Sequence, residues 1–325
     1  MAIQAYERVL VQGVDYQLGH ELGSSQQAIV FKAVPKSGGI PVAVKIPRAS
    51  RDGHYTQEVL LEEIRMNTII REGLARNNID PKHLSVMIKS FLYQGKPVCV
   101  FPYVDGLNLE SVGNLIPESE KAQRIILGLY VLADVARGLS KLHKPIYSGA
   151  NGRLVPLVHR DVKPKNIMVT RSGKGVLLDH GAAKTADTRE RDDDFATLHY
   201  MSPEQAESRY VVTPTDVFSL GMTLFEVVTS KSAFGYETLP EENSAATSEI
   251  TRRLVEELPH KLSAYAKGIP ATLDEFVNTM LAKNQTHRPT SEEVVDEFMR
   301  IAKDLQTNYH ITDAELFGWL SKTFF

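Results

Sequence analysis

The chain has 325 residues, of which 42% are apolar and 24% are charged, and its formal net charge is −3. This is the composition of an ordinary globular protein, so disordered, collagen-like and low-complexity classes are excluded. A charge so near zero lacks the basic character of most nucleic-acid-binding domains, and we expect no nucleic-acid partner.

Short strands and one helix are predicted in the first hundred residues. Residues 17–33 and 41–46 are rich in Val, Ile and Ala and are separated by a Ser-Gly-Gly turn, which predicts strands joined by a hairpin. Apolar side chains recur at helical spacing over residues 56–75, and two more strands are predicted at residues 85–93 and 96–103.

Helices are predicted in the rest of the chain. Residues 124–143, 273–282 and 291–305 carry apolar residues at helical spacing. Residues 216–228 are apolar on nearly every face, which is typical of a helix at the centre of a helical unit. The sequence therefore predicts a small β-rich part and a larger helical part, with a boundary near Tyr103.

The most specific segment is VHRDVKPKNIMV at residues 158–169. It resembles the catalytic loop of protein kinases, in which His-Arg-Asp is followed by Asn five residues after the Asp. The resemblance implies that Asp161 orients the acceptor hydroxyl and takes its proton, that Lys163 neutralises charge on the transferring phosphate, and that Asn166 binds a metal ion. A lysine at position 163 marks the Ser/Thr-specific branch.

A second segment, VLLDHG at residues 176–181, resembles the Asp-Phe-Gly element of kinases, with His180 in place of the Phe. The resemblance implies that Asp179, like Asn166, holds Mg²⁺ or Mn²⁺ against the phosphates of ATP. The middle residue of this element normally packs into the large lobe, so His180 leaves open how the active state is stabilised.

A lysine on a predicted strand follows the same family pattern. VAVK at residues 42–45 resembles the strand whose lysine, here Lys45, contacts the α- and β-phosphates and pairs with a glutamate of the next helix. Glu63 fits the apolar residues around it best. Glu62 remains the alternative.

The loop that would cover the phosphates matches weakly. LGSSQQAIV at residues 22–30 resembles Gly-x-Gly-x-x-Gly-x-Val but keeps only one glycine. Backbone amides bind the phosphates in such loops, so small residues can replace glycine with less freedom for positive φ. With the adenine pocket and hinge that the resemblance also implies, the expected nucleotide contacts are Leu22, Gly23, Ser25, Ala28, Val30, Ala43, Phe101, Tyr103, Val104 and Met168.

The segment ATLHYMSPEQ at residues 196–205 resembles the end of the activation segment in bacterial-type Ser/Thr kinases. The resemblance implies that Thr197 contacts Asp161 and Lys163 and helps to seat the acceptor hydroxyl. Such a segment shapes a surface for peptides, which disfavours a small-molecule substrate.

Three further residues have structural roles in this family. The resemblance implies a buried ion pair between Glu204 and Arg288. It also implies that Asp216 braces the backbone of the catalytic loop.

An acidic run, Asp-Asp-Asp at residues 192–194, lies where kinases with Arg before the catalytic Asp carry a phosphorylated residue. Two interpretations stay open. The carboxylates could stand in for phosphate toward Arg160, or the run could be a solvated stretch of charge. Thr185 and Thr188 are candidate phosphorylation sites.

The last residues predict an amphipathic helix. Thr-Asp-Ala-Glu at residues 312–315 forms a capping-box pattern, and Leu316, Phe317, Leu320 and Phe324 then share one helical face. This face either packs on the chain's own large lobe or docks to a partner or a second copy of the chain.

Cysteine content and apolar runs bear on the compartment. A single cysteine, Cys99, can form neither an intrachain disulfide nor a cysteine-based zinc cluster, which is typical of a reducing compartment. No apolar run reaches the ~20 residues that span a bilayer, and we expect no secretory signal because Glu7 and Arg8 precede any long apolar run. We therefore expect a cytoplasmic protein with no membrane partner and a buried, inert Cys99.

Together the motifs identify the chain as a member of the eukaryotic-like (bacterial Hanks-type) serine/threonine protein kinase family. Membership implies an α+β, two-lobed protein-kinase-like fold, with a small β-rich N-lobe, a larger α-helical C-lobe and ATP between them. The expected organisation is an N-terminal extension at 1–17, an N-lobe at 18–102 and a C-lobe at 103–305, which together form the kinase domain, and a helical tail at 306–325.

The implied function is transfer of the γ-phosphate of Mg-ATP to Ser or Thr hydroxyls of proteins, with autophosphorylation. The alternative is a pseudokinase-like module that binds ATP and partners without catalysis. The degenerate glycine loop and His180 favour this alternative. The presence of Lys45, Asp161, Asn166 and Asp179 counts against it.

Overall fold

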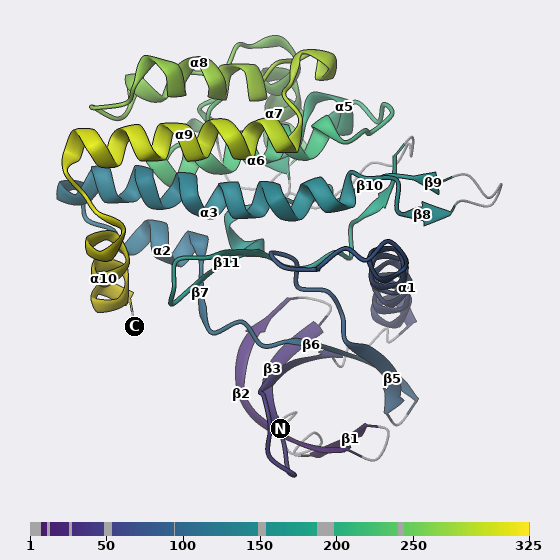
Figure 1. Ribbon diagram of the computed structural model, residues 1–325. Coiled ribbons are helices and arrows are strands. Elements are labelled where there is room, and N and C mark those ends of the chain that lie inside the picture. The colour runs from purple at the N-terminus through teal and green to yellow at the C-terminus, as the bar shows by residue number, and fades with distance from the viewer. Residues whose placement is uncertain are drawn as a thin grey trace. The chain divides into compact units, whose positions relative to one another are not determined.

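The computed structural model divides the chain into two compact units (Figure 1). The smaller unit comprises Met1–Asp80 and Ser85–Val104, and the larger unit comprises Pro81–Leu84 and Asp105–Phe325. The structure describes residues 8–11, 14–25, 28–48, 54–93, 95–148, 154–186, 198–239 and 244–324.

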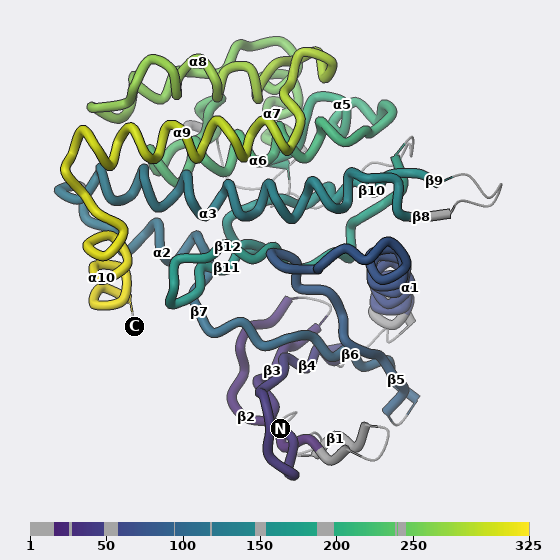
Figure 2. Tube along the Cα trace, in the orientation of Figure 1, coloured from purple at the N-terminus to yellow at the C-terminus, as the bar shows by residue number. Residues whose placement is uncertain are grey.

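An antiparallel sheet and one helix form the described part of the smaller unit. Its elements are β1 (Arg8–Val11), β2 (Val14–Ser24), β3 (Ala28–Pro35), β4 (Val42–Pro47), α1 (His54–Arg76), β5 (Lys89–Tyr93) and β6 (Lys96–Pro102). The strands lie in the order β1-β2-β3-β4-β6-β5, and the sheet is strongly curved (Figure 2). Helix α1 packs against β4 and β6.

Alternation along β4 directs its side chains to the two faces of the sheet. Val42, Val44 and Ile46 are buried in one apolar cluster with residues of β3 and β6. Because successive side chains point to opposite faces of a strand, Ala43 and Lys45 face the other way. Ala43 packs against a second cluster, which contains Leu60 of α1 and the buried Cys99. The pattern thus directs Lys45 toward α1.

The larger unit is mainly helical. Its first elements are β7 (Gly106–Asn108), α2 (Leu109–Leu115), η2 (Glu118–Glu120), α3 (Lys121–Leu142), β8 (Tyr147–Ser148), β9 (Leu154–Val155), β10 (Leu157–Val158), η3 (Pro164–Asn166), β11 (Ile167–Thr170), β12 (Gly175–Leu177) and β13 (Lys184–Thr185). The later elements are α5 (Pro203–Ala206), α6 (Pro214–Thr229), η4 (Tyr236–Thr238), α7 (Ser244–Glu256), η5 (Leu262–Ala264), α8 (Ala271–Met280), η6 (Gln285–His287), α9 (Ser291–Tyr309) and α10 (Asp313–Phe324). Helix α3 lies alongside α9 and also packs on α6 (Figure 1).

Helix α6 is buried almost all round, as its apolar sequence predicts. Short strands accompany the helices: β12, β11 and β7 form a three-stranded sheet, and β10–β13 and β8–β9 form two-stranded ladders. A β-rich smaller unit and a helical larger unit confirm the predicted α+β fold class. In the parts of the chain that the structure describes, no helix is both long enough and apolar enough to cross a membrane.

Pro81–Leu84 belong to the larger unit although their chain neighbours on both sides belong to the smaller one. His83 explains this, since its Nδ1–H donates to the Gly175 carbonyl (2.9 Å) and its own carbonyl accepts from Leu177 N–H (2.9 Å). Leu84 also forms a bridge to Leu177. These contacts fix the segment to β12.

The C-terminal helix α10 packs on the larger unit itself. Leu316 and Leu320 have no exposed surface, and Trp319 Nε1 donates to Glu120 Oε2 (2.8 Å). Of the two interpretations of the tail, packing on the chain's own unit is the one that the structure has. These two apolar side chains are therefore not open to a partner or a second copy.

Candidate active site

In the smaller unit, Lys45 lies against Glu63. Lys45 Nζ is 2.7 Å from Glu63 Oε2 and 2.8 Å from Oε1, and both side chains are largely buried. Glu63 falls on the buried stripe of α1, together with Leu60 and Ile70. Helical spacing thus brings a carboxylate to the face of the sheet that carries Lys45.

Glu62, the alternative partner, lies one residue away and points elsewhere. It forms an exposed ion pair with Arg65 in the next turn of α1 (2.7 Å). One residue corresponds to ~100° around a helix, so two adjacent glutamates cannot share a face. The geometry thus assigns Glu63 to Lys45 and Glu62 to the helix surface.

Two hydrogen bonds join Ser25, just after β2, to Ala28, the first residue of β3. Ser25 N–H donates to the Ala28 carbonyl (2.8 Å), and Ala28 N–H donates to Ser25 Oγ (3.1 Å). Ala28 itself is buried in the apolar cluster beneath α1, so its side chain serves the core. Gly23 pairs with Val30 across the hairpin, and a Cβ at Gly23 would meet nothing within 4 Å. No positive φ or close approach requires a glycine there.

The other expected nucleotide contacts lie on strands or just beyond them. In the smaller unit, Leu22 is exposed, Val30 and Ala43 are half-buried on neighbouring strands, and Phe101 is buried on β6. Tyr103 follows β6, with Lys32 Nζ 4.2 Å from the centre of its ring. The half-buried Val104 and Met168 lie in different units, Val104 in the smaller and Met168, on β11, in the larger.

In the larger unit, residues of the segment 158–169 form a compact cluster around Asp161. One carboxylate oxygen of Asp161 is 2.8 Å from Lys163 Nζ, and the other accepts from Asn166 Nδ2 (2.7 Å). The same Nδ2 also donates to the Asp161 carbonyl (3.0 Å), and the 3₁₀ turn η3 supports this arrangement. The amide of Asn166 thus donates its hydrogens to Asp161 and keeps Oδ1 as an acceptor oxygen.

Asp216 of α6 holds this loop from beneath. Its carboxylate accepts from the backbone N–H groups of His159 and Arg160 (2.8 Å each) and from His143 Nε2 (2.8 Å). Burial alone would raise the pKa of this carboxyl, but the His143 hydrogen bond and the backbone donors lower it below the usual range. The charged carboxylate thereby stabilises Arg160 at a positive φ of 69°.

Asp179 lies at the end of the β11–β12 hairpin. The carbonyl of Asn166 accepts from Leu178 N–H (2.7 Å), so the chain on either side of the hairpin is held together at this end. Asp179 is exposed, and its Oδ1 accepts from Gly181 N–H (3.2 Å). Carboxylate and amide oxygens are the donors that Mg²⁺ and Mn²⁺ prefer, so Asn166 and Asp179 fit a divalent cation.

His180 packs into the larger unit as a core residue. Its ring lies edge-on to the ring of His159, with the centroids 5.1 Å apart, and neither residue has exposed surface. The imidazole therefore occupies the kind of buried position that the family resemblance assigns to Phe.

The predicted structural pair of Glu204 and Arg288 is sealed within the larger unit. Arg288 donates two hydrogen bonds of 2.6 and 2.8 Å to the Glu204 carboxylate, and Thr215 Oγ1 donates a third (2.8 Å). Burial would raise the pKa of Glu204, but the hydrogen bonds from Arg288 outweigh it and lower the pKa.

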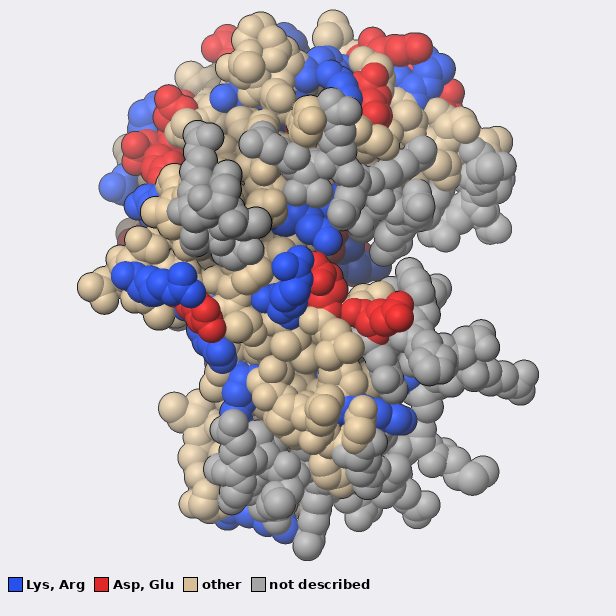
Figure 3. Space-filling model, turned by 90° about the vertical axis from the view of Figure 1, so that its right-hand side faces the viewer, with Lys and Arg blue, Asp and Glu red and all other residues tan. Residues whose placement is uncertain are grey.

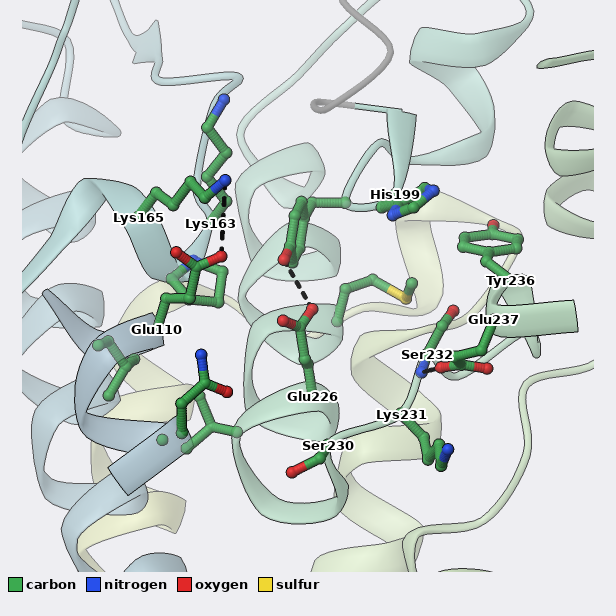
Figure 4. Close-up of a pocket in the computed structure, with 17 residues that line it drawn as sticks. Glu110, Lys163, Lys165, His199, Glu226, Ser230, Lys231, Ser232, Tyr236 and Glu237 are labelled. Carbon is green, nitrogen blue, oxygen red and sulfur yellow. Dashed lines mark hydrogen bonds and ion pairs between the residues drawn. The ribbon is translucent and has the colours of Figure 1, made fainter. Parts of the chain in front are cut away.

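Beside Lys163 lies a cavity of about 440 Å³ that the sequence analysis did not predict. Figure 4 shows Lys163 and Glu110 on one side of it, Tyr236 and Glu237 on the other, and Glu226 of α6 between them. Tyr200 OH donates to Glu226 (2.6 Å). Burial raises the pKa of Glu226 against this hydrogen bond, and Glu110 and Glu237 raise it further. In the sequence, only Glu226, a single glutamate within the apolar stretch of α6, could have indicated this cavity.

Charged side chains of both signs are interspersed among the described residues on the face in Figure 3. Neither sign dominates a broad area of the described part of this face. This distribution agrees with the formal net charge of −3.

Several predicted residues lie outside the described residues. These are Thr197, the acidic run at 192–194 and Thr188. Thr185 is described, and it pairs with Leu157 at the start of the β10–β13 ladder.

Comparisons with known proteins show the family to which the chain belongs. The family model of the protein kinase domain matches residues 16–299. Serine/threonine-protein kinase A of Synechocystis sp. is 30% identical over 291 residues, which are 86% of this chain and 51% of that protein. Serine/threonine-protein kinase PknB of Mycobacterium tuberculosis is 31% identical over 237 residues, which are 69% of this chain and 34% of that protein.

The chain thus spans about half of the length of one relative and a third of the other. The family match, in contrast, covers most of the chain and includes every segment that resembles a kinase motif. On this match, with the Asp161 cluster and the Lys45–Glu63 pair in place, the chain belongs to the protein kinase domain family.

Proposed function

We propose that the chain is an active serine/threonine protein kinase that transfers the γ-phosphoryl group of ATP to Ser or Thr hydroxyls of proteins, itself included. The observation that carries the proposal is the Asp161 carboxylate, with Lys163 Nζ at 2.8 Å and Asn166 Nδ2 at 2.7 Å. The two relatives named above, both called serine/threonine-protein kinases, support the same acceptor class.

Asp161 acts on the acceptor. The hydroxyl oxygen attacks the γ-phosphorus, the bond between that phosphorus and the β,γ-bridging oxygen breaks, and ADP leaves. Asp161 orients the hydroxyl and takes its proton. Lys163 places a positive charge beside the transferring group, which lowers the cost of charge that builds up in the transition state.

Asn166 and Asp179 are the proposed ligands of a divalent cation, Mg²⁺ or Mn²⁺. When bound, the cation supplies positive charge that screens the phosphates of ATP. The protein contributes orientation: the amide of Asn166 is fixed by Asp161, and Asp179 lies two residues after β12.

The remaining proposed contacts concern the nucleotide. Lys45, held by Glu63, binds the α- and β-phosphates, and the strand and hinge residues predicted above enclose the adenine. The turn that contains Ser25 covers the phosphates through backbone amides. Thr197 stays a prediction for the acceptor side.

The cavity beside Lys163 is the proposed place for the residues that flank the acceptor hydroxyl. Its lining combines Lys163 with His199 and Tyr200, which belong to the activation segment. A peptide bound there would lie next to Asp161, since Lys163 contacts both the cavity and that carboxylate.

Phosphate incorporation from γ-labelled ATP, with Mg²⁺ and a Ser/Thr-rich acceptor protein, tests the proposal. We expect labelled phosphoserine or phosphothreonine with the parent chain and a loss of about 10²–10⁴-fold in Asp161→Asn. The substitution keeps the side-chain shape but removes the proton acceptor. Equal incorporation by both chains would overturn the assignment.

The same experiment separates the pseudokinase alternative. A parent chain that binds ATP, seen as a rise in Tm with added nucleotide, but incorporates no label would be a non-catalytic module. The intact Asp161 cluster favours the active enzyme.

A further inference from the structure

Helix α10 meets the turn of the β11–β12 hairpin through Phe317. Gly173, in this turn, has a φ of 71°, a conformation that favours glycine. A Cβ added at Gly173 would lie only 2.3 Å from Phe317 Cε1 and 2.6 Å from Phe317 Cδ1. The edge of the Phe317 ring therefore takes the space over this turn that any other residue would fill.

Several contacts fix α10 in this position. Trp319 Nε1 donates to Glu120 Oε2 (2.8 Å), and Gln306 Nε2 of α9 donates to Asp313 Oδ1 (2.9 Å). Tyr130 of α3 donates to Gln306 Oε1 (2.5 Å), and its ring lies 6.4 Å from that of Phe317. The Phe317 ring is thus held over Gly173 by contacts to the long helices α3 and α9.

The two ends of the β11–β12 hairpin carry different features. Its closed end is the turn with Gly173, and its open end carries Asn166 before β11 and Asp179 after β12. The four residues from Thr170 back to Asn166 span about 13 Å of strand. The turn is therefore too far from the proposed metal ligands to touch them.

Between the two ends, β12 is held against α3. Gly175 N–H donates to Asp134 Oδ2 (3.1 Å), and a Cβ at Gly175 would lie 2.3 Å from the Val131 carbonyl. This close approach makes Gly175 a fixed point. From this fixed point the two strands stay paired as far as Ile167 and Leu177, so the ladder is continuous between the turn and the proposed metal ligands.

We propose that Phe317 is a positioning residue for phosphoryl transfer. By packing on Gly173 it sets the tilt of the hairpin, and through the hairpin it places Asn166 and Asp179 for the divalent cation. The inference rests on the proposed function, because that function assigns these two residues to the metal.

Metal affinity distinguishes positioning from simple stabilisation of the fold. Mn²⁺ is titrated into the full chain with saturating ADP, and free Mn²⁺ is followed by electron paramagnetic resonance. We expect Phe317→Ala to weaken Mn²⁺ binding by at most about 10-fold, the low end of what the loss of a direct contact to a metal ligand costs, because Phe317 acts only through the hairpin. We expect Phe317→Leu, which restores an apolar contact, to recover most of the affinity.

Two controls match the change. Lys322→Ala alters an exposed residue of the same helix and leaves Phe317 and the contacts that anchor it in place, and Phe298→Leu removes an aromatic ring from the buried face of α9. Unfolding free energies are measured for every variant. We expect both controls to bind Mn²⁺ as the parent does, whatever stability they lose.

Mn²⁺ binding by Phe317→Ala that equals the parent's, or a loss shared by Phe298→Leu at similar stability, would overturn the inference. Should Phe317→Ala not fold, Phe317→Leu against Phe298→Leu makes the same comparison. A parent that binds Mn²⁺ with ADP but transfers no phosphate refutes the proposed function alone. A parent that binds no Mn²⁺ refutes both.

Discussion

Two ion pairs, one in each unit, show how similar groups serve different ends. The side chains of Lys45 and Glu63 in the smaller unit are 16% and 5% exposed, whereas those of Arg288 and Glu204 in the larger unit are 0% and 3% exposed. A lysine that keeps some exposure can contact a phosphate as well as its glutamate. The enclosed arginine has no such access.

The two pairs also differ in their basic residue, which is arginine in the enclosed pair and lysine in the accessible one. Arginine offers a rigid fork that matches a carboxylate at two points, as Arg288 does with Glu204, and it suits a permanent buried pair. Lysine is a compact charge on a flexible stem, and Lys45 can adjust its position when a ligand binds. Access to solvent thus separates the pair that we propose contacts the nucleotide from the pair that holds the fold.

The largest effect is expected from breaking the sealed pair. Arg288→Met leaves the Glu204 carboxylate buried without its partner, and the free energy of unfolding in urea should fall by about 3–5 kcal/mol. Adding Glu204→Gln should restore part of the loss, because the uncompensated charge is gone. A decrease in unfolding free energy of less than about 1 kcal/mol would show that this pair contributes no more than an exposed ion pair. The contrast between the two units would then be lost.

The same change in the smaller unit should act on rate in addition to stability. Lys45→Met should lower kcat/KM for ATP by about 10²-fold, since a charge aimed at the phosphates is lost. Its free energy of unfolding should fall as well, because the Glu63 carboxylate, 5% exposed, loses its partner. The loss of rate is therefore the result that separates this pair from the sealed one.

Glu62→Gln is the control for the Lys45 experiment. Its carboxylate pairs with the exposed Arg65, so we expect parental activity and a stability change under about 1 kcal/mol. Rates that fell with Glu62→Gln but survived Glu63→Gln would contradict the pairing described above.

The smallest effect concerns a third buried contact, between His83 Nδ1 and Asp134 Oδ2 at 3.7 Å. Burial lowers the pKa of His83 from its ordinary 6.5, more than the Gly175 hydrogen bond and Asp134 raise it. The unfolded chain therefore takes up this proton at a higher pH than the folded chain does. The stability due to neutral His83 is complete above about pH 6.5 and falls as the pH drops further.

Unfolding free energies at about pH 8 and about pH 5.5 measure this dependence. His83→Asn should show a flatter profile than the parent, because asparagine does not titrate and tolerates the positive φ of this position. Identical slopes in the two chains would show that His83 does not contribute.

Long periodic helices could be predicted from sequence, whereas short elements could not. The helix predicted at residues 216–228 is Pro214–Thr229, and the one predicted at 124–143 is Lys121–Leu142. The hairpin of β8 and β9 was not predicted, because strands of two residues carry no periodicity.

The site divides in a similar way, according to whether side chains or backbone do the chemistry. The proposed roles of Asp161 and Asn166 could be assigned from sequence, because only particular side chains can accept a proton or bind a cation. The β2–β3 turn was weakly marked, because backbone amides tolerate many residues and Ser25 closes the turn as glycine would not. The role of Phe317 required the structure, since Gly173 lies 144 positions earlier in the chain.

Residues 81–84 have a consequence for dissecting the molecule. A fragment that ended at Val104 would contain this segment but lack Gly175 and Leu177, to which His83 is hydrogen-bonded. A fragment that began at Asp105 would in turn leave the edge of β12 uncovered. Neither unit can therefore be obtained intact by a single cut, so the two are expected to be inherited and engineered together.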